Sequence, residues 1–237
     1  MNVLIDAGNL QKTYGEGESK TEALKKVSIK VRAGEFVAII GPSGSGKSTL
    51  MNILGCLDRP DSGNYLFENR DIGKLSDIEL AKIRNRKIGF VFQAFNLLAR
   101  TSALKNVELP LIYSGVKQDE RNTRAMQVLE DVNLSDKLKS TPAQLSGGQQ
   151  QRVAIARALI NNPLVIFADE PTGNLDTKSS NEIMEIFKKL NEKGRTIVMI
   201  THEKDIAQRA ARIITMRDGQ ITSDKKNLHK KRNITQV

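Results

Sequence analysis

The stretch that decides the fold is FVAIIGPSGSGKSTLMNIL, at residues 36–54. Its first five residues, FVAII, are all apolar, which is typical of a β-strand that is covered on both faces. Residues 41–49, GPSGSGKST, then match the pattern G-x-x-x-x-G-K-[ST]. A loop of this kind, between a buried strand and a helix, binds phosphate groups through its backbone N–H groups.

The residue types of the loop suit nucleotide phosphates. Gly44 and Gly46 let the backbone approach a phosphate closely, Lys47 supplies positive charge, and the Ser48 hydroxyl can bind Mg²⁺. The apolar residues that follow recur at helical spacing and predict one buried helix face, formed by Leu50, Ile53, Leu54 and Leu57. We expect phosphate contacts from Gly41, Pro42, Ser43, Gly44, Ser45, Gly46, Lys47, Ser48 and Thr49.

Further apolar runs extend this pattern into an α/β fold. LVIFA at 164–168 and TIVMI at 196–200 predict two more buried strands, and residues 178–191 between them have helical spacing. Strands that alternate with helices imply a parallel sheet with its ligands at the carboxyl ends of the strands. LKKVSIKVR at 24–32 instead alternates apolar and polar residues, so the first third is expected to add an antiparallel sheet.

Two adjacent carboxylates, Asp169 and Glu170, end the strand at 164–168. At this edge of the sheet Asp169 is expected to hold Mg²⁺ through water, and Glu170 to act as general base toward an attacking water. A helix N-cap is the alternative role for either acid.

A second glycine motif, LSGGQ at 145–149, precedes the helical stretch QQRVAIARALI. A helix that begins at Ser-Gly-Gly presents free N–H groups and can bind an anion. Because the chain already has one phosphate loop, the second motif suggests that two chains share each nucleotide. A Gly-Gly pair is also common in ordinary loops.

Composition excludes several classes of protein. The chain has 237 residues, one cysteine (Cys56), no tryptophan and 4% aromatic residues. These values argue against a disulfide framework and against a base-stacking surface for single-stranded nucleic acid. The longest apolar runs are five residues, too short for a membrane span, and the N-terminal residues lack the pattern of a signal peptide.

The net charge of +10 is concentrated toward one end. Residues 224–237 hold five Lys/Arg and one Asp. We therefore expect one domain over 1–223 and a basic, disordered tail over 224–237.

The order of these motifs resembles the ATP-binding cassette (ABC) ATPase family over essentially residues 1–223, and LSGGQ is highly specific to that family. The resemblance implies a P-loop NTPase (RecA-like) parallel core, an antiparallel β subdomain and a helical signature subdomain at about 94–158. It also implies roles for four single residues. Gln93 would contact Mg²⁺ and water, His202 the γ-phosphate, Tyr14 the adenine ring, and Asp176 the dimer interface.

The resemblance also implies an activity and partners. Two copies would bind and hydrolyse two ATP molecules, with Mg²⁺ as cofactor. Each ATP would lie between the phosphate loop of one copy and a set of residues from the other, namely Ser146, Gly147, Gly148, Gln149 and Asp176. Lys47, Glu170 and His202 would be catalytic, and Ser48, Gln93 and Asp169 would hold the metal. The partner would be an integral membrane permease, and no nucleic acid is expected as a partner. The chain itself would be cytoplasmic and peripheral on the inner face of the cell membrane.

A narrower resemblance, to the macrolide-exporter and lipoprotein-releasing branch, rests on NILGCLDRPDSG at 52–63, IGFVFQ at 88–93 and ADEPTGNLD at 168–176. It implies export of peptides, macrolides or lipoprotein-like cargo. The alternative is a soluble or regulatory ABC ATPase that acts on nucleic acid or in translation.

Overall fold

A six-stranded sheet forms the centre of the computed structural model, which describes residues 2–227. Its strand order is β10-β9-β3-β8-β7-β6, and every neighbouring pair is parallel except β9 and β10. The predicted parallel α/β core is therefore confirmed. The strands are β3 (Phe36–Ile40), β6 (Ile88–Phe92), β7 (Val165–Asp169), β8 (Thr196–Ile200), β9 (Arg212–Arg217) and β10 (Gln220–Lys226).

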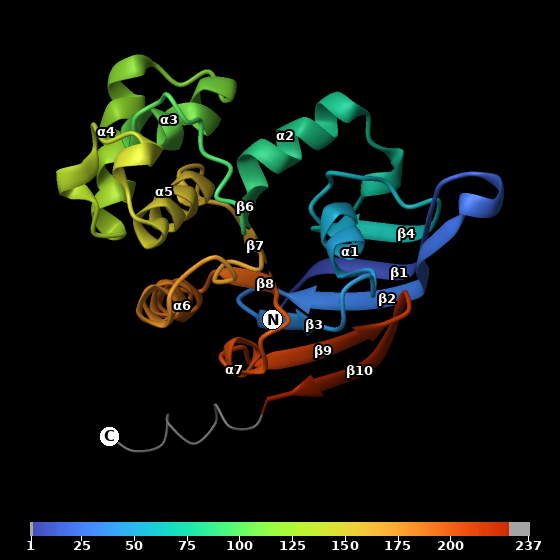
Figure 1. The fold of residues 1–237 in the computed structure, drawn as a ribbon. Coiled ribbons are helices and arrows are strands. Elements are labelled where there is room, and N and C mark those ends of the chain that lie inside the picture. Colours follow the sequence, from blue (N-terminus) through green and yellow to red (C-terminus); the bar gives the residue numbers. More distant parts are fainter. Residues whose placement is uncertain (1, 228–237) are drawn as a thin grey trace.

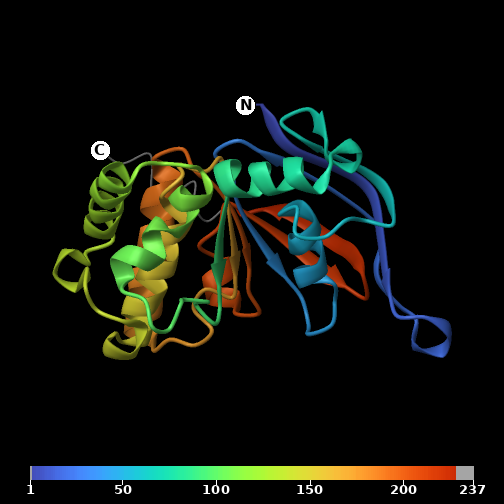
Figure 2. The ribbon, with the colours of Figure 1, turned by 90° about the horizontal axis from the view of Figure 1, so that it is seen from above.

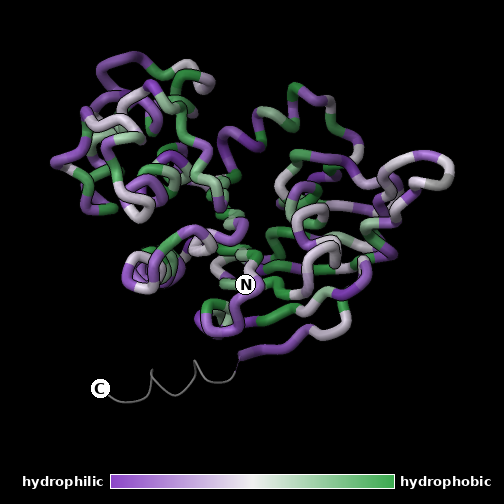
Figure 3. Tube along the Cα trace, in the orientation of Figure 1, coloured by the Kyte–Doolittle hydropathy of each residue, from purple (hydrophilic) through white to green (hydrophobic). Residues whose placement is uncertain are grey.

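The central strands are apolar because both of their faces are covered. In β3, Val37 and Ile39 face one hydrophobic core, whereas Phe36 and Ala38 face the other. Side chains alternate along a strand, so a strand between two cores needs an apolar residue at every position. Figure 3 shows hydrophobic segments in the middle of the molecule, between the layers.

A four-stranded antiparallel sheet with the order β2-β1-β4-β5 covers one side. The predicted alternating strand at 24–32 is confirmed, with Leu24, Val27, Ile29 and Val31 buried, but it begins earlier, at Thr21. Its neighbour β1 was not predicted. The strands of this sheet are β1 (Val3–Tyr14), β2 (Thr21–Arg32), β4 (Ser62–Phe67) and β5 (Arg70–Asp71).

The helices divide between the two sides of the central sheet (Figure 1). Helix α1 lies beside the antiparallel sheet, and α2, whose buried Leu80 and Ile83 join the same core, leads to β6 (Figure 2). Helices α3, α4 and α5 gather in one helical lobe (Figure 1). The helices are α1 (Lys47–Leu54), α2 (Asp77–Lys87), α3 (Ala103–Tyr113), α4 (Gln118–Asp131), α5 (Gly147–Leu159), α6 (Thr177–Glu192) and α7 (Lys204–Ala207).

Helix α1 ends earlier than its apolar spacing predicts. Gly55 is its C-cap, and Cys56 follows with φ 58°, a left-handed conformation that stops the helix. Leu57 was predicted on the buried face, but it lies beyond the helix and is 47% exposed. It lines a groove that is described below.

The C-terminal boundary differs from the prediction. Residues 224–226 were assigned to a disordered tail, but they belong to β10, which pairs with β9. The guanidinium of Arg212 donates two hydrogen bonds to the carboxylate of Asp224, at 2.6 and 2.5 Å. The folded domain therefore continues at least to Lys226, and the rest of the predicted tail, 228–237, lies outside the described residues. None of the helices within 2–227 has the length and apolar character that crossing a membrane requires.

Candidate functional site

The phosphate loop leaves the central strand β3 and leads directly into α1. Gly46 is the N-cap of α1 with φ 93°, and a side chain there would collide with the carbonyl oxygen of Ala23 in β2. Any larger residue would need both a strained backbone and movement of β2. Only glycine fits this approach, so the position of the loop depends on the antiparallel sheet as well as on β3.

The Lys47 side chain is buried beneath the loop. Its ammonium donates to the carbonyl oxygens of Gly41 at 3.0 Å and Pro42 at 2.8 Å, and lies 3.4 Å from the Ser45 hydroxyl. Burial lowers the pKa of Lys47, although the charges of Glu170 and Asp169 oppose this shift. Since these bonded acceptors are neutral oxygens, the ammonium keeps a positive charge that can bind an anion held in the loop.

Asp169 and Glu170 stand at the carboxyl end of β7, near Lys47. Burial raises the pKa of Asp169, the charge of Glu170 raises it further, and the charge of Lys47 lowers it. Glu170 has φ 44°, and its backbone N–H donates to the carbonyl oxygen of Ile200 in β8 at 2.9 Å. Because the charge of Glu170 disfavours ionisation of Asp169, a cation bound beside the two carboxylates would stabilise the site.

His202 follows β8 and faces Glu170. Its Nδ1 lies 3.1 Å from Oε1 of Glu170, and its side chain is 61% exposed. Glu170, His202 and loop residues 41–49 line one pocket of about 630 Å³. The sequence reasoning missed the remaining wall, which comes from the start of β2 and the β9–β10 turn, namely Thr21, Glu22, Ala23, Lys25, Asp218 and Gly219.

Three other predicted residues do not line this pocket. Asp169 is the last residue of β7, directly before Glu170. Gln93, just after β6, donates its side-chain N–H to Oδ1 of Asn174 at 3.3 Å and accepts at its carbonyl from Nδ2 of Asn174 at 3.1 Å. Tyr14 ends β1, is 43% exposed, and donates its hydroxyl to Asp58 at 2.8 Å.

The LSGGQ motif begins α5 on the helical lobe. Ser146 is the N-cap, and a capping box links it to Gln149 in both directions. Neither residues 146–149 nor Asp176 lines the pocket. Asp176 caps α6 by accepting from the backbone N–H of Ser179 at 2.9 Å. The LSGGQ motif and the start of α6, which Asp176 caps, are neighbours, because Gly148 lies against Ser179.

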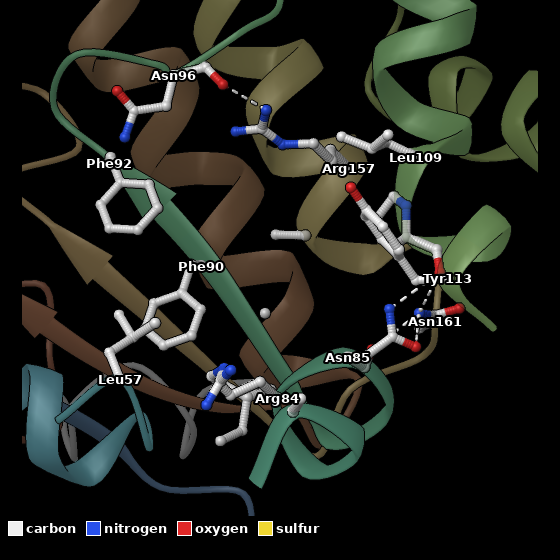
Figure 4. A pocket seen from close by; sticks show the side chains of 15 residues that line it. Leu57, Arg84, Asn85, Phe90, Phe92, Asn96, Leu109, Tyr113, Arg157 and Asn161 are labelled. Atoms are coloured by element: carbon white, nitrogen blue, oxygen red, sulfur yellow. Dashed lines mark hydrogen bonds between the residues drawn. The ribbon is translucent and has the colours of Figure 1, made fainter. Parts of the chain in front are cut away.

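A groove of about 610 Å³ lies between the helical lobe, α2 and the turn that follows α1. Leu57, Phe90, Phe92 and Tyr113 contribute apolar surface, and Arg84 and Arg157 contribute positive charge (Figure 4). Arg84 donates to the carbonyl oxygen of Cys56 at 2.7 Å, and Arg157 donates to those of Phe95 and Asn96 at 2.8 and 2.5 Å.

The comparisons with known proteins agree with this architecture. The family model described as ABC transporter matches residues 24–173. An uncharacterized ABC transporter ATP-binding protein of Thermotoga maritima is 56% identical over 221 residues, covering 93% of this chain and 94% of that protein. The macrolide export ATP-binding/permease protein MacB of Chlorobaculum tepidum is 56% identical over 223 residues, covering 94% of this chain but 34% of MacB.

Among solved structures, a dimeric ATP-binding cassette in a post-hydrolysis state, bound to ADP and Pi, matches with a TM-score of 0.87 and 49% identity, covering 94% of this chain and 98% of the other. The P-loop fold with an antiparallel subdomain is thus confirmed. The phosphate loop, the carboxylates and the LSGGQ helix occupy a framework that the matched proteins share over nearly the whole chain. This chain belongs to the ABC transporter family, as an ATP-binding domain with ATPase activity.

Proposed function

We propose that this chain is the ATP-hydrolysing subunit of a membrane exporter. One observation carries the proposal: the phosphate loop with its buried lysine, Glu170 and His202 line one pocket of about 630 Å³, and Asp169 ends β7 directly before Glu170. In this proposal residues 41–49 hold the phosphates, and the ring of Tyr14 packs against the adenine base. The alternative that acts on nucleic acid lacks support, because MacB and the pyoverdine exporter PvdT are named for export.

The residues at the pocket fit a magnesium ion. No group of three or more His, Cys, Asp or Glu within 2–227 could hold a metal by itself. Mg²⁺ at phosphate sites needs only one or two protein oxygens, since phosphate and water provide the rest. The Ser48 hydroxyl and the Asp169 carboxylate would supply these, and Gln93 would be a further ligand. The bound ion would neutralise charge on the phosphate oxygens.

Glu170 and His202 are proposed to work as a pair. Glu170 would orient a water and accept its proton, because its carboxylate lines the pocket at the strand end. His202 would fix the Glu170 side chain through their 3.1 Å contact and reach toward the γ-phosphate. Lys47 would stabilise the negative charge. The work of the site is therefore positioning and charge stabilisation.

A second copy is proposed to complete the site. Ser146, Gly147, Gly148 and Gln149 present a helix start on a separate lobe, away from the chain's own pocket. A head-to-tail homodimer would place these residues, with Asp176, against the nucleotide of the partner. The matched cassette structure is described as dimeric, which supports this arrangement.

The groove is proposed to receive a cytoplasmic segment of a membrane permease. Tyr113 is 76% exposed and Leu57 47% exposed, while the guanidiniums of Arg84 and Arg157 are bonded to neutral carbonyls. An occupant with apolar side chains and a carboxylate would complement this surface. The name of MacB joins an ATP-binding part to a permease, which supports such a partner. The chain would then act at the cytoplasmic face of the membrane.

The test is ATP hydrolysis by the purified chain, followed by capture of its partner. We expect MgATP turnover that Lys47→Ala abolishes. A tagged chain in detergent-solubilised membranes should retain an integral membrane protein. Retention of nucleic acid or ribosomes in place of a membrane protein would overturn the transport proposal and leave the ATPase activity intact.

A further inference from the structure

Tyr14 is anchored more firmly than its 43% exposure would suggest. Its hydroxyl donates to Oδ2 of Asp58, 44 residues away in the chain, at 2.8 Å. The other oxygen of Asp58, Oδ1, accepts from the Lys12 ammonium at 2.9 Å and from the backbone N–H of Arg59 at 2.7 Å. Asp58 therefore joins the end of β1 to the turn that follows α1.

Lys12 contacts the same ring from its face. Its ammonium lies 5.3 Å from the centre of the Tyr14 ring and also donates to the carbonyl oxygen of Arg59 at 2.8 Å. The Lys12 side chain is only 13% exposed. A cation at this distance from an aromatic face is attracted by the ring electrons. The Tyr14 ring is thus held at its hydroxyl and at its face.

The backbone on either side of the ring is fixed as well. The N–H of Thr13 donates to Oδ2 of Asp61 at 2.7 Å. Thr49, the last residue of the phosphate motif, opposes the rise that burial causes in the pKa of Tyr14. This influence places the Tyr14 side chain near the start of α1.

The protonation states suit this arrangement. Burial raises the pKa of Tyr14, and the hydrogen bond to Asp58 raises it further. Burial also pushes the pKa of Asp58 upward, but hydrogen bonds from Lys12, Tyr14 and Arg59 outweigh it, so that the pKa of Asp58 is lowered. At neutral pH the phenol donates and the carboxylate accepts.

We propose that Asp58, together with Lys12, is a positioning residue that holds the Tyr14 ring in the orientation needed to pack on the nucleotide base. This inference rests on the proposed function, in which Tyr14 contacts adenine. An exposed ring that is already fixed loses little conformational entropy when a base stacks on it. Asp58 and Lys12 would therefore contribute to affinity for the base, and the phosphate loop would bind phosphate without them.

The experiment compares ATP with inorganic tripolyphosphate, which has phosphates but no base. Dissociation constants are measured by calorimetry on the whole chain, without divalent metal so that no hydrolysis occurs. We expect Asp58→Ala and Lys12→Met to weaken ATP binding about fivefold to tenfold and to leave tripolyphosphate binding unchanged. Tyr14→Phe keeps the ring and removes only the anchored hydroxyl, and should weaken ATP binding in the same direction.

Asp6→Asn is the matched control, because it breaks another ion pair of the same sheet, that of Lys30 with Asp6 at 2.9 Å. It should change neither constant. Tyr14→Ala distinguishes the two proposals. If it weakens ATP binding while Asp58→Ala and Lys12→Met do not, the positioning role is overturned and the base contact stands. If Tyr14→Ala leaves ATP binding unchanged, the base contact fails and the positioning role fails with it.

A spectroscopic readout tests the anchor itself. The chain has three tyrosines and no tryptophan, and Tyr65 is buried. In a Tyr113→Phe background, the alkaline absorbance titration reports Tyr14, because burial holds the pKa of Tyr65 well above its ordinary value. Asp58→Ala should lower the pKa of Tyr14, and an unchanged titration curve would show that Asp58 does not hold the hydroxyl.

Discussion

The imidazole of His202 and the carboxylate of Glu170 face each other with Nδ1 and Oε1 3.1 Å apart. They follow β8 and β7, neighbouring parallel strands whose register places Asp169 beside Ile200. The sheet thus fixes their separation, because each residue lies one or two positions beyond a hydrogen-bonded strand end.

Replacing Glu170 should separate binding from hydrolysis. Glu170→Gln keeps the size of the side chain but cannot accept a proton from water, so turnover should fall by about 10²–10⁴. MgATP binding should persist, and an ATP-bound dimer should accumulate in light scattering. Glu185→Gln, on the exposed side of α6, is the control. Near-normal turnover by Glu170→Gln would assign this acid a structural role.

Hydrolysis should depend on protein concentration, because the LSGGQ helix is expected to complete the pocket of a partner. Specific activity is measured over a dilution series, and should rise as dimers form. Mixtures of Lys47→Ala chains with Ser146→Arg chains should recover part of the activity, since each heterodimer contains at most one intact composite site. Concentration-independent turnover without an ATP-dependent dimer would contradict the shared site.

The groove should determine partner capture. Tyr113→Asp places a charge on its most exposed aromatic residue and should reduce recovery of the membrane partner at least tenfold. Ile78→Asp, on an exposed position of α2 outside the groove lining, is the matched control. Circular dichroism verifies that both variants fold. Equal recovery by the two variants would move the docking surface elsewhere.

Cys56 should be unreactive in the folded chain. Burial raises the pKa of its thiol to about 11, and the side chain is 2% exposed. Thiol reagents at pH 8 should therefore label it only after unfolding in guanidinium. The unfolded thiol ionises near pH 9 and the folded one near pH 11, so its contribution to stability is present below pH 9 and lost as pH rises to 11. Comparing the pH dependence of unfolding with that of Cys56→Ala isolates the contribution of the thiol to stability. Fast labelling of the native chain would contradict the expectation that Cys56 is unreactive.

Asp224 should stabilise the last strand. Asp224→Asn removes the charge from a pair whose Arg212 side chain is 15% exposed and also contacts Glu35 at 3.1 Å. We expect a loss of about 1 kcal/mol in the free energy of unfolding, discounted for the partial exposure of Asp224. Asp218→Asn, in the far more exposed pair with Arg217, should cost less in the same urea titration. Equal losses would place Asp224 among ordinary surface charges.

The sequence best predicts strands that are buried on both faces and loops that require glycine. Strands β3 and β8 match their apolar runs at every residue, because a wholly apolar run in a parallel sheet has few alternatives. The strand β1 escaped prediction, since polar residues interrupt its alternation and Asn9 has φ 52°. The strand β10 escaped because its sequence, QITSDKK, is mostly polar and because, within residues 2–227, it is an edge strand that pairs only with β9.

The residues of the site also differ in how well the sequence predicts them. Residues 41–49 and the pair Asp169–Glu170 follow from local patterns. Gln93 and His202 are single polar residues in loops, and only resemblance to the family indicates them. Asp58 lay beyond any local pattern, because its partners are 44 and 46 residues away and meet it only through tertiary folding.

The order of the central sheet affects how the chain can be made. The strand β3 is synthesised early, but its two neighbours, β8 and β9, come from residues 196–200 and 212–217. A ribosome-bound chain must therefore carry an apolar strand with both edges unpaired through most of its translation. Such delayed, non-local pairing slows folding and leaves nascent chains exposed to aggregation. A chain stopped before residue 196 would keep its phosphate-binding sequence and yet lack both strands that pair with β3, from which the phosphate loop begins.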